Sequence, residues 1–232
     1  MSEAEARDEV LDTDAGEFPL LDYRLRRGGR EWTVLHVAAI LTDEDETRAL
    51  VRKTNRLPYG VSLWPSAIAL GHEVAVRAAD FRGRSVLELG AGVGLPGIVA
   101  ASLGGRAVQT DRDELALHLC RRNAERNGLG AIDHRLADWT EWAETGRYDW
   151  ILAADVLYSD SLHPHLRRIF ETNLAPGGRV LLSDPFRPDG LRFLEGLEAI
   201  GWTVTFSKWE VGDEATPRTI GVFELTPPTG PR

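Results

Sequence analysis

Apolar and polar positions alternate along most of the chain in a way that predicts strands and helices in turn. From residue 86 onward, short apolar runs are followed by longer segments in which apolar residues recur at helical spacing. The predicted strands cover 86–89, 106–110, 132–136, 149–154 and 179–183, and the predicted helices cover 96–103, 113–127, 161–173 and 189–200. Such alternation is typical of a parallel sheet with helices on both faces.

The two ends of the chain depart from this alternation. Residues 202–209 and 219–225 are extended runs joined by a polar turn with no room for a helix, so we expect an antiparallel pair. Residues 20–37 are two extended runs around Gly28-Gly29, and glycines supply the positive φ angles of a hairpin turn. The predicted fold class is therefore α/β, with seven mostly parallel strands, a C-terminal antiparallel pair and an N-terminal β-hairpin and helix extension.

Capping signals mark two further helices. Thr42 is expected to cap a short acidic helix that runs to about Lys53. Ser66 is expected to cap a helix that reaches about Ala79, after a loop with two prolines.

The same signals suggest a domain organisation. Residues 1–17 are acidic and poor in apolar side chains, so we expect a flexible tail there. The hairpin and short helix form an extension over 18–56, the main domain spans 57–226, and 227–232 is a flexible end.

Composition and charge exclude several classes of protein. The 232 residues are 43% hydrophobic, yet no apolar run approaches the length of a membrane span, and the N-terminus does not resemble a signal peptide. One cysteine, Cys120, rules out an internal disulfide and suits a reducing compartment; we expect it to be buried in a helix. The net charge of −9 argues against nucleic acid as a partner. We therefore expect a cytoplasmic protein that binds neither nucleic acid nor membrane.

A metal centre is also not expected. His163-Pro164-His165 suggests a metal pair, but no carboxylate or cysteine cluster accompanies the two histidines.

The stretch from Val86 to Gly97 joins a strand to a helix through a glycine-dense turn. Gly90, Gly92 and Gly94 allow the backbone to turn sharply and to approach a ligand closely. The free amides of the following helix N-terminus attract a carboxylate or a phosphate. Because the spacing also fits the G-x-G-x-x-G pattern, the loop alone suits either a nicotinamide dinucleotide or another adenosine cofactor.

Polar and aromatic residues follow the next strands at the edge where ligands bind in open α/β sheets. Asp111 ends the second strand, and a carboxylate there can accept both hydrogen bonds of a ribose diol. Asp138 can accept the adenine amino hydrogens, and Trp139 offers a flat apolar face. These strand ends favour an adenosine-containing cofactor.

The combined motifs resemble the seven-stranded S-adenosylmethionine-dependent methyltransferases, and within them the methyltransferase-like protein-lysine branch. That branch includes enzymes acting on molecular chaperones and on the electron-transfer flavoprotein β subunit. The resemblance covers roughly residues 57–225. It rests on Leu63-Trp64-Pro65-Ser66-Ala67, the loop at 86–94, Asp138-Trp139 and Asp155-Val156-Leu157-Tyr158.

This resemblance implies a Rossmann-like fold, S-adenosyl-L-methionine as the cofactor and a set of binding residues. The residues that would line its methionine and ribose parts are Glu88, Gly90, Ala91, Gly92 and Gly94. Asp111 would hold the ribose hydroxyls and Trp139 would flank the adenine. Trp64 would close over the cofactor, and Ala154 would add a backbone contact.

By the same resemblance, Asp155 and Tyr158 would face the target amine as the catalytic pair. A carboxylate favours the ammonium form of a lysine, so we expect Asp155 to capture and orient the substrate and Tyr158 to position the neutral amine. The strand-end loops at 159–165 and 184–188, together with the N-terminal extension, are expected to set substrate specificity.

The predicted function is methylation of a lysine side chain on a protein substrate. Within enzymes, a small-molecule amine or heteroaromatic N-methyltransferase is the alternative. From other classes, an NAD-binding oxidoreductase and a non-catalytic module that binds an adenosine metabolite are also considered. Methylation of DNA adenine or glutamine is not expected, because those enzymes carry Asn-Pro-Pro-Tyr where this chain has Asp155-Val156-Leu157-Tyr158.

Overall fold

The structure is a computed structural model that describes residues 9–13, 16–37, 59–212 and 217–228. The expected helix from Thr42 to Lys53 lies outside these residues. Within them, no helix is both long and apolar enough to cross a membrane.

The main sheet has seven strands. Their bounds are β4 Ser85–Leu89, β5 Arg106–Asp111, β6 Asp133–Leu136, β7 Tyr148–Ala154, β8 Leu174–Asp184, β9 Thr203–Val211 and β10 Arg218–Thr226. They lie in the order β6-β5-β4-β7-β8-β10-β9. The first five pair in parallel, whereas β10 runs antiparallel to both β8 and β9. The predicted α/β fold class with a C-terminal antiparallel pair is confirmed.

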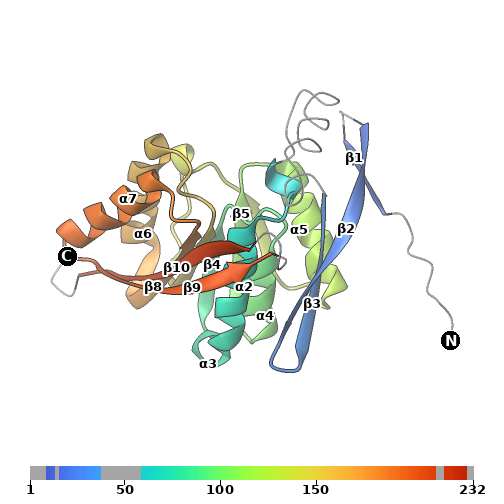
Figure 1. The fold of residues 1–232 in the computed structure, drawn as a ribbon, viewed down its shortest axis with the longest axis horizontal. Helices are drawn as coiled ribbons and strands as arrows, with labels where there is room; N and C mark the ends of the chain where they lie inside the picture. The colour runs from blue at the N-terminus through green and yellow to red at the C-terminus, as the bar shows by residue number, and fades with distance from the viewer. Residues whose placement is uncertain (1–8, 14–15, 38–58, 213–216, 229–232) are drawn as a thin grey trace.

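Helices cover both faces of this sheet (Figure 1). Their bounds are α2 Pro65–Val76, α3 Ala78–Phe81, α4 Leu95–Ser102, α5 Glu114–Arg126, α6 His163–Asn173 and α7 Pro188–Ala199, with short 3-10 turns η1 Tyr59–Val61, η2 Trp139–Glu141 and η3 Asp160–Leu162. Apolar residues of α2, α4 and α5 share one buried cluster, and those of α6 and α7 share another. The central strands β4 and β7 are buried over most of their length, which is why they read as nearly continuous apolar runs.

The N-terminal hairpin is also confirmed. β2 Gly16–Arg27 and β3 Arg30–Val37 pair antiparallel, and the connecting Gly28 and Gly29 have φ angles of 57° and 75°. A third strand, β1 Val10–Thr13, pairs with β2 inside the segment expected to be a flexible tail. The expectation is wrong over these residues because Leu11 is buried in the core, a contact that the acidic composition of the segment conceals.

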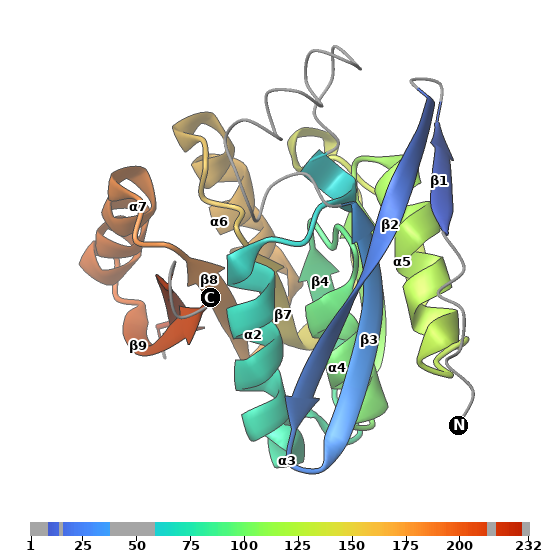
Figure 2. The ribbon, with the colours of Figure 1, turned by 45° about the vertical axis from the view of Figure 1, so that its right-hand side comes forward.

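The hairpin lies beside α5 (Figure 2), and it is docked there by Asn123 of α5 and by Asn127, the C-cap residue of that helix. Asn123 accepts a hydrogen bond from the Leu35 amide at 2.7 Å and donates to the Leu35 carbonyl at 3.0 Å. Asn127 makes the same pair of bonds with the backbone of Thr33, at 3.1 and 2.8 Å. Asn123 also donates to the carbonyl of Val93 at 2.9 Å, so one side chain joins the hairpin to the glycine loop.

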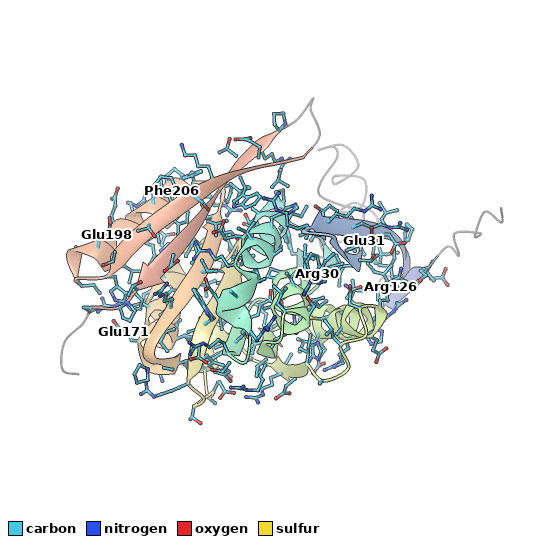
Figure 3. The ribbon with its side chains drawn as sticks, turned by 90° about the horizontal axis from the view of Figure 1, so that it is seen from below. Arg30, Glu31, Arg126, Glu171, Glu198 and Phe206 are labelled. Atoms are coloured by element: carbon cyan, nitrogen blue, oxygen red, sulfur yellow. The ribbon has the colours of Figure 1, made fainter. Side chains whose placement is uncertain are left out.

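Ion pairs at the outer side of α5 add to this docking. Arg126 donates to Glu9 at 2.7 Å and to Asp22 at 2.8 Å, and Figure 3 shows Arg126 beside the hairpin. These side chains are partly exposed, and exposed ion pairs contribute little stability. The buried asparagine contacts are therefore the main polar link.

The start of α2 differs from the prediction. The helix begins at Pro65 with Trp64 as the N-cap residue, and no side chain makes the capping hydrogen bond. Ser66 lies inside the first turn, fully buried, so it is not the cap. Proline at the first helical position has a suitable φ and no unsatisfied N–H, which explains the earlier start.

Candidate active site

A cavity of about 700 Å³ lies at the carboxyl ends of the parallel strands. Its wall is formed by residues at or just after the ends of β4, β5, β6 and β7, together with residues of η1 and η3 and the residues that precede α2 and α7. The lining residues are Tyr59, Gly60, Trp64, Gly90, Gly92, Asp111, Arg112, Asp113, Ala137, Asp138, Trp139, Ala154, Asp155, Val156, Tyr158, Leu162 and Arg187. Most of the site residues expected from the sequence are thus brought together in one wall.

The glycine loop shapes one side of the cavity. Gly90 and Gly92 have φ angles of 65° and 55°, which side chains rarely adopt. A Cβ at Gly90 would lie 3.1 Å from the Trp139 ring, and one at Gly92 would lie 3.3 Å from the carbonyl of Gly60. The absence of side chains at these positions therefore keeps the cradle open between the loop, the indole and η1.

Three expected cofactor contacts, Glu88, Ala91 and Gly94, do not line the cavity. Glu88 is buried, and its Oε2 accepts hydrogen bonds from the Gly97 amide at 3.1 Å and from Gln109 Nε2 at 2.6 Å. Burial is the main reason that the pKa of Glu88 is raised to about 8. Glu88 therefore supports the glycine loop through buried hydrogen bonds and not from the cavity wall.

The remaining neighbours complete this buried layer. Gln109 Nε2 also donates to the Gly94 carbonyl at 2.9 Å, and the Cys120 thiol donates to Gln109 Oε1 at 3.1 Å. The expected burial of Cys120 is confirmed, and burial raises the pKa of its thiol. Gly94, with φ 85°, is the N-cap of α4, and a side chain there would collide with the Cys120 sulfur.

Asp111 is fixed against the loop as well as exposed to the cavity. Its Oδ2 accepts a hydrogen bond from the Gly92 amide at 2.9 Å, and its Oδ1 accepts one from the Asp113 amide at 3.0 Å. Burial raises its pKa above the ordinary value. Each carboxylate oxygen has a further lone pair, so this side chain can also accept hydrogen bonds from a ligand diol.

Aromatic rings border the cavity on two sides. Trp139 lies against Gly90, and Trp64 stacks on Tyr59 with ring centroids 6.0 Å apart. The indole N–H of Trp64 donates to the Tyr59 carbonyl at 3.2 Å. Tyr59 was not predicted as a site residue from the sequence; its signal is its place five residues before Trp64, on the segment that packs over Gly92.

The Asp138 side chain accepts hydrogen bonds within its own turn. Its Oδ1 accepts hydrogen bonds from the amide and the hydroxyl of Thr140, at 2.8 and 2.7 Å, and these bonds lower its pKa. It caps the turn that carries Trp139 and also lines the cavity.

Asp155 and Tyr158 lie in the cavity wall with different surroundings. Asp155 has a φ angle of 60°, and its amide donates to the Ser183 carbonyl at 2.9 Å. Its carboxylate forms an ion pair with Arg187, which the sequence analysis did not identify individually. Tyr158 is 55% exposed, and its hydroxyl has no hydrogen-bond partner among the described residues. Asp155 is therefore paired with Arg187 and also faces the cavity.

The part of the chain that the structure describes contains no cluster of three or more metal-ligating side chains. The described sheet also differs from the six-stranded dinucleotide-binding order, because the antiparallel β10 is inserted between β8 and β9.

The fold and this site define a methyltransferase of the Rossmann-like class. The sequence pattern described for lysine methyltransferases matches residues 41–198. This chain belongs to the lysine methyltransferase family.

Individual relatives agree with this assignment. Protein N-lysine methyltransferase METTL21A of Danio rerio is 32% identical over 179 residues, which cover 74% of this chain and 71% of the relative. The electron transfer flavoprotein beta subunit lysine methyltransferase of Mus musculus is 34% identical over 136 residues, which cover 56% of this chain and 52% of the relative. The chain thus spans about half the length of the mouse enzyme.

A solved structure shares the fold. The 16S rRNA methyltransferase RsmC of T. thermophilus, in complex with AdoMet and guanosine, has a TM-score of 0.60 and 19% sequence identity. The match covers 90% of this chain and 50% of that one. At this level of identity the likeness concerns the fold.

Proposed function

We propose that this chain binds S-adenosylmethionine in the strand-end cavity and transfers its methyl group to a lysine side chain of a protein substrate. The observation that carries the proposal is that a single cavity is lined by the glycine loop and Asp111 and also by Asp155 and Tyr158. Membership of the lysine methyltransferase family supports the choice of a lysine amine as acceptor.

The cavity residues fit the parts of this cofactor. The glycine loop, through Gly90 and Gly92, would line the amino-acid end of S-adenosylmethionine. Asp111 would accept the ribose hydroxyls, and the Trp139 face would flank the adenine with Asp138 at its edge. Trp64 and Tyr59 would cover the cofactor, and Ala154 would contribute a backbone contact. Glu88, Ala91 and Gly94 would act indirectly, by holding the loop.

The chemistry required of the protein is limited, because the bound cofactor supplies a methyl group on a positive sulfur that is already a strong electrophile. The residues must align the acceptor and exclude water. A lysine has an ordinary pKa of about 10.4, so removing its proton near neutral pH costs roughly 4 kcal/mol. Tyr158 would orient the neutral amine through its hydroxyl, and Asp155 would receive the substrate side chain at the same wall.

The first test is ligand binding followed by transfer. We expect S-adenosylhomocysteine, but not NADH, to stabilise the protein against heat, and Asp111→Asn to weaken that effect. Incubation with labelled S-adenosylmethionine and lysate, followed by mass spectrometry, should then locate the label on protein lysines.

Each rival gives a different result in this experiment. Stabilisation by NADH alone would indicate an oxidoreductase, and label only in small metabolites would indicate a small-molecule methyltransferase. Binding of S-adenosylhomocysteine without any transfer would indicate a sensing module.

We also propose a cytoplasmic protein with a protein partner. The lone buried thiol of Cys120 is suited to a reducing compartment, and the named relatives act on proteins. Fractionation of cells that express the tagged chain would test the compartment.

A further inference from the structure

A chain of ion pairs crosses the cavity wall between the ends of β7 and β8. Arg187, the N-cap residue of α7, contacts the Asp155 carboxylate and donates from Nη1 to Asp184 Oδ2 at 2.8 Å. The Asp184 Oδ1 atom also accepts the Arg187 amide at 2.7 Å. The two carboxylate side chains are 9% and 2% exposed, whereas that of Arg187 is 31% exposed. The cation is therefore the more accessible member of the group.

The backbone at Asp155 and next to Arg187 is held in an unusual conformation. Asp155 and Phe186 are the described non-glycine residues with positive φ angles, at 60° and 61°. Such conformations persist only where the surroundings enforce them. The Phe186 ring is held by edge contacts with Phe206 and Phe223, at centroid distances of 6.0 and 5.7 Å. Arg187 is thus aimed at Asp155 by a rigid loop.

The ion pair with Arg187 changes how strongly Asp155 attracts a positively charged ligand. A carboxylate with no cation beside it attracts an ammonium ion and stabilises the protonated form of an amine. Here the single positive charge of Arg187 is shared between Asp155 and Asp184, so it weakens the attraction of Asp155 for a cation and itself repels a second cation at short range. The other charged residues of the wall, Asp111, Arg112, Asp113 and Asp138, follow β5 and β6 on the cofactor side of the predicted site.

We propose that Arg187 is a positioning residue that holds Asp155 in place and weakens the attraction of the acceptor end of the cavity for an ammonium ion. This inference rests on the proposed function of the cavity as the methyl-donor site. It assigns to Asp155 an orienting role in place of the simple capture of a cation. Arg187 then favours loss of the lysine proton before methyl transfer.

Sinefungin tests this charge preference without any protein substrate. It resembles S-adenosylhomocysteine but carries a protonated amine where the cofactor carries its methyl sulfonium. We would measure the affinities of both ligands by calorimetry for the full chain and for Arg187→Gln. We expect the variant to shift the affinity ratio towards sinefungin by about tenfold, the equivalent of one pKa unit of differential interaction. Arg187→Lys, which keeps the charge, should restore most of the original ratio.

Arg192→Gln is the matched control, since Arg192 also lies on α7 but pairs with the exposed Asp189 away from this cavity. Its ratio should equal that of the unaltered protein. If Arg187→Gln does not fold, Asp155→Asn provides the second test and should shift the ratio against sinefungin. An unchanged ratio in a folded variant overturns the role of Arg187 while leaving the methyltransferase proposal intact. Failure of the unaltered protein to bind either ligand overturns both.

Discussion

At the residue scale, protonation of the buried Glu88 carboxyl should make the free energy of unfolding depend on pH. Its ordinary pKa is 4.5, and burial raises the pKa to about 8 despite hydrogen bonds that favour the charged form. The folded chain therefore binds a proton that the unfolded chain releases, and the free energy of unfolding falls as pH rises through this window, by a few kcal/mol at most. Glu88→Gln keeps an oxygen acceptor but cannot ionise. Urea unfolding of both proteins should show a flatter pH dependence for the variant, and parallel curves would refute this account.

At the element scale, the attachment of the hairpin to α5 should affect ligand binding. Asn123→Ala removes a fully buried side chain that bonds to Leu35 and to Val93, which should destabilise the fold by about 2–4 kcal/mol. We also expect weaker binding of S-adenosylhomocysteine, because Val93 lies in the glycine loop. Asn127→Ala is the control, since Asn127 bonds to the same strand but not to that loop. Equal losses of affinity in the two variants would contradict the coupling.

At the scale of the whole molecule, a ligand that binds only the folded chain should raise its melting temperature. Saturation at about 100 times the dissociation constant adds about 2.7 kcal/mol to the free energy of unfolding. For a domain of this size, this corresponds to a shift of roughly 5–10 °C. Scanning calorimetry with and without S-adenosylhomocysteine measures it directly. A shift that did not grow with ligand concentration would exclude specific binding to the folded state.

Much of this architecture follows from patterns within short stretches of the chain. Buried parallel strands read as apolar runs, and their carboxyl ends carry Asp111, Trp139 and Asp155 to one edge whatever the details of packing. The pairing of Asp155 with Arg187 was not predictable, because it depends on how two separate strand-end loops approach each other. The strand at Val10–Thr13 was missed for a related reason, since it is stabilised by a distant core.

The contacts of Asn123 with the hairpin and the glycine loop involve only main-chain atoms of Leu35 and Val93. A tether of this kind is indifferent to which side chains its partners carry. Natural sequences can therefore vary at those two positions, within the limits of an apolar core, and still keep the hairpin attached. The asparagine itself has no such freedom, because an amide presents a donor and an acceptor in one plane. The requirement for one particular side chain therefore falls on position 123 and not on positions 35 and 93.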